Sequence, residues 1–206
     1  MKRILLIAVI ALTTGFVYAQ EMTVGTKLVG VGVGQGWSYN ANLVTGGLSP
    51  AVRGTFDLGM FEIEPGVITI GGQIGYLYEG KYEGVYYDYS YSNIWPYYNY
   101  SAYNYKWTYH SLLIAARSAW HYNFGQLGIR ELSAYAGVAA GLRYQMVIES
   151  IDSNMPAGYG GATNSAKPYF SSYLGAYYYL TPDIAGFAEV GYGISWLTIG
   201  FNFRLK

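Results

Sequence analysis

The chain has 206 residues, of which 28 are glycine and 25 tyrosine, with 12% charged residues and a formal net charge of zero. Since cysteine is absent, a disulfide framework, a thiolate metal site and a lipidated cysteine are excluded. The low and balanced charge provides no basic surface of the kind that binds nucleic acid, so no nucleic-acid partner is expected.

Residues 1–19 have the pattern of a secretory signal peptide. Lys2 and Arg3 form a charged start, residues 4–12 are apolar, and Val17 and Ala19 are the recognition positions of a cleavage site. The alternative is an uncleaved anchor helix, but the apolar run is well short of the roughly 20 residues that a spanning helix needs. We therefore expect the mature domain at residues 20–206, with 10 basic and 12 acidic side chains.

The mature sequence alternates between apolar and small or polar residues at period two, which is typical of strands with two unlike faces. In the first strand, glycine occupies every second position, a spacing that a GxGxxG phosphate-binding turn would not show. Tyrosines fall on both sides of residues 169–180, so the facing of that strand is left open. The predicted strands are residues 27–36, 51–60, 67–78, 110–122, 131–147, 169–180, 185–192 and 197–205.

The connections between these strands alternate in length. The connections after the first, third and fifth strands are long, and residues 79–106 form the longest irregular stretch. The connections after the second, fourth and sixth strands are short: residues 61–66, 123–130 and 181–183. A soluble sandwich would have strands of about 5 to 6 residues, whereas strands of about 9 to 11 residues with aromatic ends fit a membrane-spanning barrel. The pattern predicts an all-β fold, an eight-stranded antiparallel up-and-down transmembrane barrel with both termini periplasmic.

Charged residues on the inward faces are predicted to form ion pairs that fill a narrow lumen, because Arg or Lys facing lipid at the bilayer midplane costs about 2 to 4 kcal/mol. Glu189 and Arg204 lie on adjacent strands and are expected to pair. A gate or substrate site is the alternative interpretation. The candidate lumen residues are Arg53, Asp57, Arg117, Arg143, Glu189 and Arg204.

Tyrosine is concentrated in residues 79–106, with tryptophan beside it. One interpretation is an aromatic rim; the other is an adhesive surface, since tyrosine offers a large amphipathic contact area at low entropic cost. Strand-like segments here would present tyrosine on both faces. The candidate recognition residues are Tyr86, Tyr87, Tyr89, Tyr91, Trp95, Tyr97, Tyr98, Tyr100, Tyr103 and Tyr105.

A lipid-modifying enzyme is a rival hypothesis, based on His110, Ser111 and Glu189. Neighbouring residues on a strand point to opposite faces, which separates His110 from Ser111. A metal site built from His110 and His121 has less support, because the two lie far apart at about 3.3 Å per residue. No catalytic residue, metal or cofactor is therefore predicted.

Three stretches of the sequence carry a family resemblance: Ser49-Pro50-Ala51-Val52, Val67-Ile-Thr-Ile-Gly-Gly72 and Phe187-Ala-Glu-Val-Gly-Tyr-Gly193. With them the chain resembles the small eight-stranded outer-membrane beta-barrel proteins of Gram-negative bacteria, over nearly the whole mature chain. Such barrels commonly end on an aromatic residue, whereas Phe203 here is followed by Arg204-Leu205-Lys206. The resemblance implies an outer-membrane location, with outer-membrane lipid and the barrel insertion machinery as partners.

Eight strands leave an interior just wide enough for side chains. We therefore expect a barrel without an open pore, with a structural role or a recognition (adhesion) role through the tyrosine-rich loop. An extracellular protein or a glycan would be the partner. The alternatives are an outer-membrane lipid-modifying enzyme and a narrow channel for small solutes.

Overall fold

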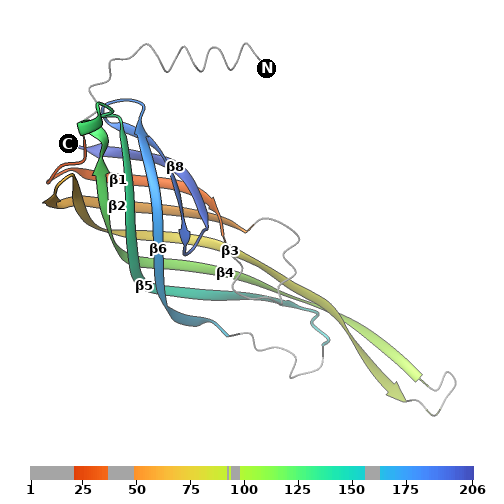
Figure 1. Ribbon diagram of the computed structural model, residues 1–206. Helices are drawn as coiled ribbons and strands as arrows, with labels where there is room; N and C mark the ends of the chain where they lie inside the picture. Colours follow the sequence, from red (N-terminus) through yellow and green to blue (C-terminus); the bar gives the residue numbers. More distant parts are fainter. Residues whose placement is uncertain (1–20, 37–48, 92, 94–97, 156–162) are drawn as a thin grey trace, which may run out of the picture.

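The computed structural model describes residues 21–36, 49–91, 93, 98–155 and 163–206, so the predicted signal peptide lies outside the described part of the chain. Eight antiparallel strands close into a ring (Figure 1). A short 3-10 helix, Phe124–Leu127, connects the fourth and fifth strands. The strands are β1 Lys27–Gln35, β2 Pro50–Ile63, β3 Gly66–Tyr91, β4 Tyr98–Asn123, β5 Leu132–Ile151, β6 Ser165–Tyr179, β7 Ile184–Tyr192 and β8 Leu197–Leu205.

Each strand pairs with its neighbour in the sequence, and β1 closes the ring with β8. In that closing pair Lys27 lies opposite Leu205, so β1 begins and β8 ends at the same end of the barrel (Figure 1). The connections after β2, β4 and β6 lie at this end, and those after β1, β3 and β5 lie at the other, together with the short turn at residues 193–196 between β7 and β8. Within the described residues, no helix is long and apolar enough to cross a membrane.

The outer surface of the ring is apolar and the inner surface is polar, as the period-two alternation predicts. On β2, for example, Phe56 is 41% exposed whereas Asp57 is 7% exposed. Large apolar side chains such as Ile74, Ile114 and Val138 are more than 60% exposed around the outside. A continuous apolar belt of this kind is suited to lipid rather than water. The chain is therefore an eight-stranded transmembrane barrel, as predicted.

The structure also shows how β6 faces. Its odd-numbered tyrosines, Tyr169, Tyr173, Tyr177 and Tyr179, are buried inside the barrel, while Phe170 and Leu174 point outward and Tyr178 is 42% exposed. Between β5 and β6, one inward tyrosine ring from each strand extends over a glycine of the other strand. Tyr173 lies opposite Gly137, and Tyr135 lies opposite Gly175. A Cβ at either glycine would lie within 2.5 Å of the opposing ring, so glycine is what gives these rings room.

Three predicted connections are shorter in the structure than the sequence indicates, and a fourth keeps its length. The turn predicted at residues 61–66 shrinks to Glu64 and Pro65, and the loop predicted at residues 148–167 is bounded by β5 and β6 at Ile151 and Ser165. Residues 123–130 contain the 3-10 helix. The largest difference is at residues 79–106, predicted as the longest irregular stretch, which belong mostly to β3 and β4, each 26 residues long. The expected strand-like segments with tyrosine on both faces are present there.

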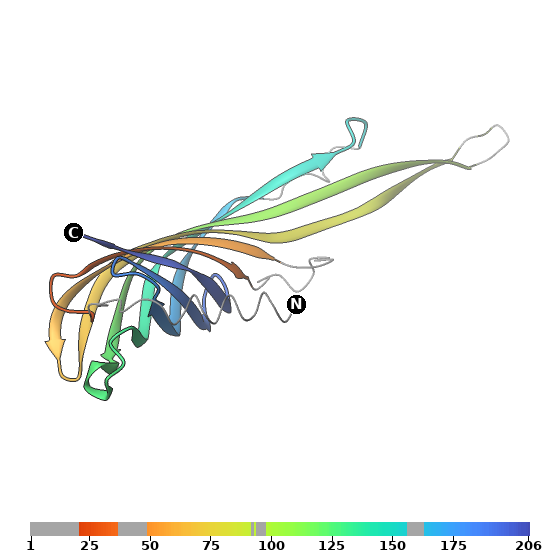
Figure 2. The same cartoon turned by 90° about the horizontal axis from the view of Figure 1, so that it is seen from above.

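The extended part of β3 and β4 forms an arm, here defined as residues 80–91 and 98–109, which projects well beyond the ring (Figures 1 and 2). At about 3.3 Å per residue, its 12 residues of β3 span about 40 Å. β4 remains paired with β5 as far as Tyr105 opposite Ile151, so β5 supports the lower half of the arm. Cross-strand pairing continues to Tyr91 opposite Tyr98.

A β-bulge marks the base of the arm. Tyr78 lies opposite His110 and Gly80 opposite Tyr109, which leaves Glu79 as the extra residue on β3. Gly80 has φ of 134°, a backbone conformation that favours glycine. Because of the extra residue, the even-numbered residues of β3 share a face with the odd-numbered residues of β4 throughout the arm.

Candidate functional site

A cluster of ion pairs fills the middle of the barrel. Arg53 forms an ion pair with Glu189, and Arg117 lies 3.1 Å from Asp57 and 3.3 Å from Glu189. The Tyr135 hydroxyl donates a hydrogen bond of 3.1 Å to Glu189. All four charged side chains are no more than 7% exposed as residues. Buried charges of opposite sign thus lie together, as their desolvation requires.

A second polar cluster lies toward the arm and is centred on Glu79, which is fully buried. Its carboxylate accepts hydrogen bonds from the Ser111 hydroxyl and, at 2.7 Å, from the Gln145 amide, and Arg143 lies 3.6 Å away. Sequence reasoning missed Glu79 because it treated residue 79 as the start of a loop. The inward series Gln73, Gly75 and Leu77 continues to residue 79, and this was the available signal.

The predicted pair of Glu189 with Arg204 is wrong. The β7–β8 register places Thr198 opposite Glu189, and Arg204 lies six residues further along β8. Arg204 instead donates hydrogen bonds of 3.0 Å to the Glu21 carbonyl and to the Tyr179 hydroxyl, near the end of the barrel where β1 begins and β8 ends. Strand parity gave the correct face for Arg204, but parity does not determine which residue of the neighbouring strand lies opposite.

The arm has two different faces. On the ladder face, defined by Tyr82, Tyr86, Tyr103, Tyr105 and Trp107, aromatic rings stack across the two strands. Tyr82 and Trp107 are nearly parallel, with centroids 5.5 Å apart and planes 10° apart. Tyr105 contacts both of these rings, and Tyr86 stacks on Tyr103 with centroids 6.5 Å apart. The Trp107 indole also donates a hydrogen bond of 2.8 Å to Glu149 of β5.

The outer face of the arm carries the exposed tyrosines. Tyr87 is 50% exposed, Tyr91 66%, and Tyr89 and Tyr100 each 70%. The predicted recognition residues are thus divided between the two faces: Tyr86, Tyr103 and Tyr105 pack in the ladder, whereas Tyr87, Tyr89, Tyr91 and Tyr100 face solvent. Trp95 and Tyr97 lie outside the described residues, and for Tyr98 only the backbone is described.

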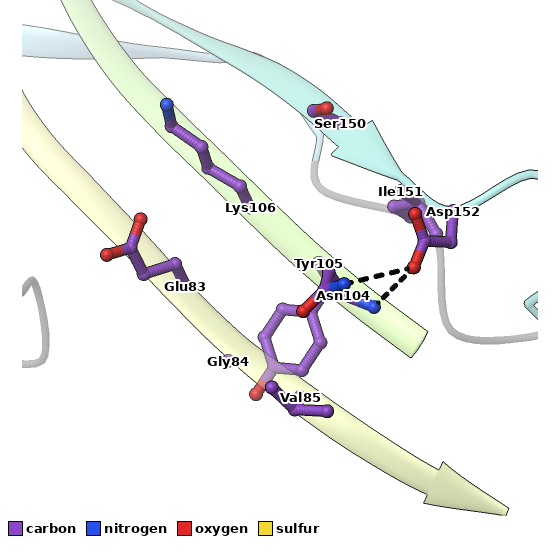
Figure 3. A pocket seen from close by; sticks show the side chains of 9 residues that line it. All are labelled: Glu83, Gly84, Val85, Asn104, Tyr105, Lys106, Ser150, Ile151 and Asp152. Carbon is purple, nitrogen blue, oxygen red and sulfur yellow. Dashed lines mark hydrogen bonds between the residues drawn. The ribbon is translucent and has the colours of Figure 1, made fainter. Parts of the chain in front are cut away.

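Nearer the membrane, the outer face contains a pocket of about 490 Å³ between β3, β4 and β5 (Figure 3). The Asp152 carboxylate accepts hydrogen bonds from the Asn104 backbone and side-chain amides, at 2.7 and 3.4 Å, and Asp152 donates its own backbone N–H to the Asn104 carbonyl. These contacts hold the end of β5 against β4. The lining residues are Glu83, Gly84, Val85, Asn104, Tyr105, Lys106, Ser150, Ile151 and Asp152.

The residues of the rival enzyme hypothesis are separated in the structure. His110 lies on the lipid-facing side, where its Nδ1 is 2.7 Å from the Tyr76 hydroxyl. Ser111 is buried inside against Glu79, and Glu189 belongs to the central ion-pair cluster. His121 lies inside the barrel, stacked on Tyr135. Among the described residues, no group of His, Cys, Asp and Glu has the arrangement of a metal site.

Neither protein-family models nor curated proteins match this sequence. Solved structures that are similar include a de novo designed transmembrane beta-barrel, at 18% identity and a TM-score of 0.44, covering 90% of this chain and 100% of that one. Another is Ail, the attachment invasion locus protein of Yersinia pestis, at 11% identity and a TM-score of 0.42, covering 88% and 96% of the two chains. The structure of Ail in a nanodisc has 9% identity and a TM-score of 0.41, covering 88% and 99%. At these identities the likeness concerns the fold.

Proposed function

We propose that this protein is an outer-membrane barrel of a Gram-negative bacterium that has no open pore and recognises a surface partner through the arm. The observation on which the proposal rests is the arm itself, which projects well beyond the ring (Figure 2). Its side chains Tyr87, Tyr89, Tyr91 and Tyr100 are exposed to solvent. A set of exposed aromatic side chains of this kind is typical of an interaction surface. The partner would be an extracellular protein or a glycan that stacks on these rings.

The packing inside the barrel supports the absence of a pore. A cavity among Arg53, Asp57, Arg117 and Glu189 measures only about 10 Å³, which is room for about one water molecule. Met22 is fully buried near the end of the barrel where β1 begins, and its carbonyl accepts a hydrogen bond from the Asn123 side-chain amide. Eight strands leave little space beyond the side chains themselves, so this interior favours a closed barrel over a solute channel.

The orientation proposed is with the arm outside the cell and both termini in the periplasm, because long connections in such barrels are extracellular and short ones periplasmic. Outer-membrane lipid would contact the apolar belt. During assembly the insertion machinery would contact β8, whose lipid-facing side includes Phe203.

The separation of His110 from Ser111 supports a binding role rather than lipid modification.

The arm can be shortened without disturbing the ring. Asp88 and Ser101 lie opposite each other, so residues 89–100 can be replaced by an Asn-Gly turn that joins the two strands in register. This distal-arm deletion retains the ladder face and the pocket. We expect it to insert normally, to keep its heat-dependent gel mobility and to lose binding of whole cells to immobilised matrix proteins and glycans.

A length-matched control replaces Tyr87, Tyr89, Tyr91 and Tyr100 with serine and leaves the arm intact. Loss of binding in this variant as well would assign recognition to the aromatic rings. Binding equal to that of the parent protein in both variants, at equal surface amounts, would overturn the proposed function.

A further inference from the structure

We propose that the pocket on the outer face of the arm binds a neutral sugar unit of the outer-leaflet glycolipid next to the barrel. This inference rests on the outer-membrane placement proposed above, but not on recognition by the distal tyrosines. The pocket and those tyrosines occupy different parts of the arm, so the two proposals can be tested separately.

The strand registers place the pocket directly above the lipid-facing belt. Lys81 of β3, Thr108 of β4 and Ile148 of β5 form one row, and Ile148 is 59% exposed on the outside. Glu83, Lys106 and Ser150 form the next row on the same side. The two rows are separated by about 6 to 7 Å along the strands. The pocket therefore lies beyond the apolar belt, at the height of groups that are carried on lipid headgroups rather than at the height of the acyl chains.

A group of aromatic side chains on the membrane side of the pocket is further evidence for the position of the pocket relative to the membrane. Tyr76 and Tyr78 both pack against His110 on the outer side, with centroids 5.9 and 5.6 Å from the imidazole. Aromatic girdles of membrane barrels mark the boundary between the apolar belt and the headgroups. Lys106 lies four residues beyond His110 on β4, which is about 13 Å along the strand.

The charges in and beside the pocket favour a neutral ligand over a phosphate. Glu83 and Asp152 contribute two carboxylates, and Lys81 and Lys106 contribute two ammonium groups. Lys81 is engaged by Glu83 at 2.8 Å, and among the described residues Lys106 has no ion-pair partner. A phosphate beside Lys106 would also lie near two carboxylates, and like charges repel.

Sugar hydroxyls both donate and accept hydrogen bonds, and the pocket offers partners of both kinds. Lys106 donates, the carboxylates accept, and Ser150 and Asn104 do both. The bonds between Asp152 and Asn104 hold one wall in place before any ligand binds (Figure 3). The volume of about 490 Å³ is in the usual range of about 300 to 1,000 Å³ for small-molecule sites.

The position of the pocket also favours a membrane-anchored sugar over a free glycan. The pocket opens on the side of the barrel that faces lipid, where sugars attached to neighbouring lipids are held at the right height and high local concentration. A glycan approaching from the medium would first have to displace them.

The test uses the full-length mature barrel in phosphatidylcholine nanodiscs, titrated with a neutral monoglycosyl diacylglycerol. The backbone amides of Asn104, Ser150 and Asp152 report binding by NMR. We expect their signals to shift and to saturate. Phosphatidylglycerol, which supplies a phosphate and no sugar, should leave them unshifted at the same mole fraction.

Two variants make the test specific. Asn104→Ala removes the side-chain amide but keeps the backbone N–H that bonds Asp152, so the wall should remain and affinity should fall about tenfold. The matched control is Glu149→Gln, at the same height on the ladder face, which should bind as the parent does. A non-saturating response, an equal response to phosphatidylglycerol, or unchanged affinity in Asn104→Ala would overturn the inference.

The distal-arm deletion separates this inference from the proposed function. It leaves the pocket intact and should bind the glycolipid with unchanged affinity. Failure of the parent barrel to bind the glycolipid, with cell adhesion still dependent on residues 89–100, would overturn only the sugar site. Saturable glycolipid binding, with adhesion that does not depend on the distal arm, would overturn only the recognition role.

Discussion

Glu189 is the residue on which the interior charges converge, because it contacts Arg53, Arg117 and the Tyr135 hydroxyl. Glu189→Gln removes one negative charge and leaves both guanidinium groups buried. Breaking a buried pair in this way typically costs about 3 to 5 kcal/mol. We expect a correspondingly lower urea midpoint for the folded barrel in detergent, followed by tryptophan fluorescence and gel mobility.

The control is Asp183→Asn, which breaks an ion pair with Lys206 whose side chains are 44% and 87% exposed. Exposed pairs are worth about 0 to 1 kcal/mol, so this change should barely move the midpoint. Equal effects of the two substitutions would mean that Asp57 alone neutralises the interior arginines.

At the base of the arm, Lys81 and Glu83 form an exposed ion pair that gives a pH prediction. The hydrogen bond to Lys81 lowers the pKa of Glu83, and the same bond raises the pKa of Lys81. The pair is therefore lost only when pH falls through the lowered Glu83 pKa or rises through the raised Lys81 pKa, and it persists at neutral pH. Lys81→Met should raise the Glu83 pKa toward its ordinary value, measured by NMR of the carboxyl carbon.

Lys106→Met is the comparison for that titration. Lys106 also lowers the Glu83 pKa, but it is the last and smallest of the causes. A rise in this variant as large as that in Lys81→Met would contradict the assignment of the effect to the direct hydrogen bond.

Among the elements, the bulge at Glu79 depends on the residue that follows it. Gly80 has φ of 134°, and a side chain in such a conformation costs about 1 to 3 kcal/mol. We expect Gly80→Ala to lower the unfolding midpoint and to increase cleavage of the arm by added protease. Gly72→Ala, where the nearest atom lies 3.6 Å from the new Cβ, should behave like the parent. Equal behaviour of the two variants would contradict a strained bulge.

The ladder face is the second element-level device, because it gives a two-stranded arm a packed side. Tyr82 contacts both Tyr105 and Trp107, and aromatic pairs contribute about 0.5 to 1.5 kcal/mol beyond burial. Tyr82→Ala should therefore speed hydrogen exchange of the arm amides while leaving those of the ring unchanged. Tyr89→Ala, at a 70% exposed position, should have little effect on exchange. Faster exchange in Tyr89→Ala alone would contradict the ladder.

Sequence reasoning succeeded where the two faces of a strand differ in polarity and failed where they do not. On β2 the apolar Phe56 faces outward and the charged Asp57 faces inward. Because such contrasts recur along the ring strands, the ring and its closure could be predicted. In the arm, tyrosine occurs on both faces, and no contrast marks residues 79–106 as strands. The bulge at Glu79 then shifts the alternation by one residue. Glu189 pairs with Arg53 rather than with Arg204 because of the stagger between strands in the closed ring. The alternation of residues along a single strand contains no information about that stagger.

At the scale of the whole molecule, the filled interior predicts that the barrel conducts no ions. With a central cavity of about 10 Å³, the purified monomer in a planar bilayer should give no stable conductance. Replacing Arg53, Arg117 and Glu189 together with alanine removes three long side chains that line the central cavity and should produce small, measurable currents if the variant remains folded, as checked by gel mobility. Stable nanosiemens-scale conductance from the unmodified protein would contradict the closed interior.

The arm continues two strands of the ring but takes no part in closing it, and this makes its length a free variable. Adding or removing one residue from each strand beyond Asp88 and Ser101 moves the tip by about 3.3 Å and leaves the register below unchanged. A step of two residue pairs also keeps every remaining side chain on its face. The distance between the arm tip and the membrane can thus change in small steps during evolution, while the membrane-embedded part keeps its sequence.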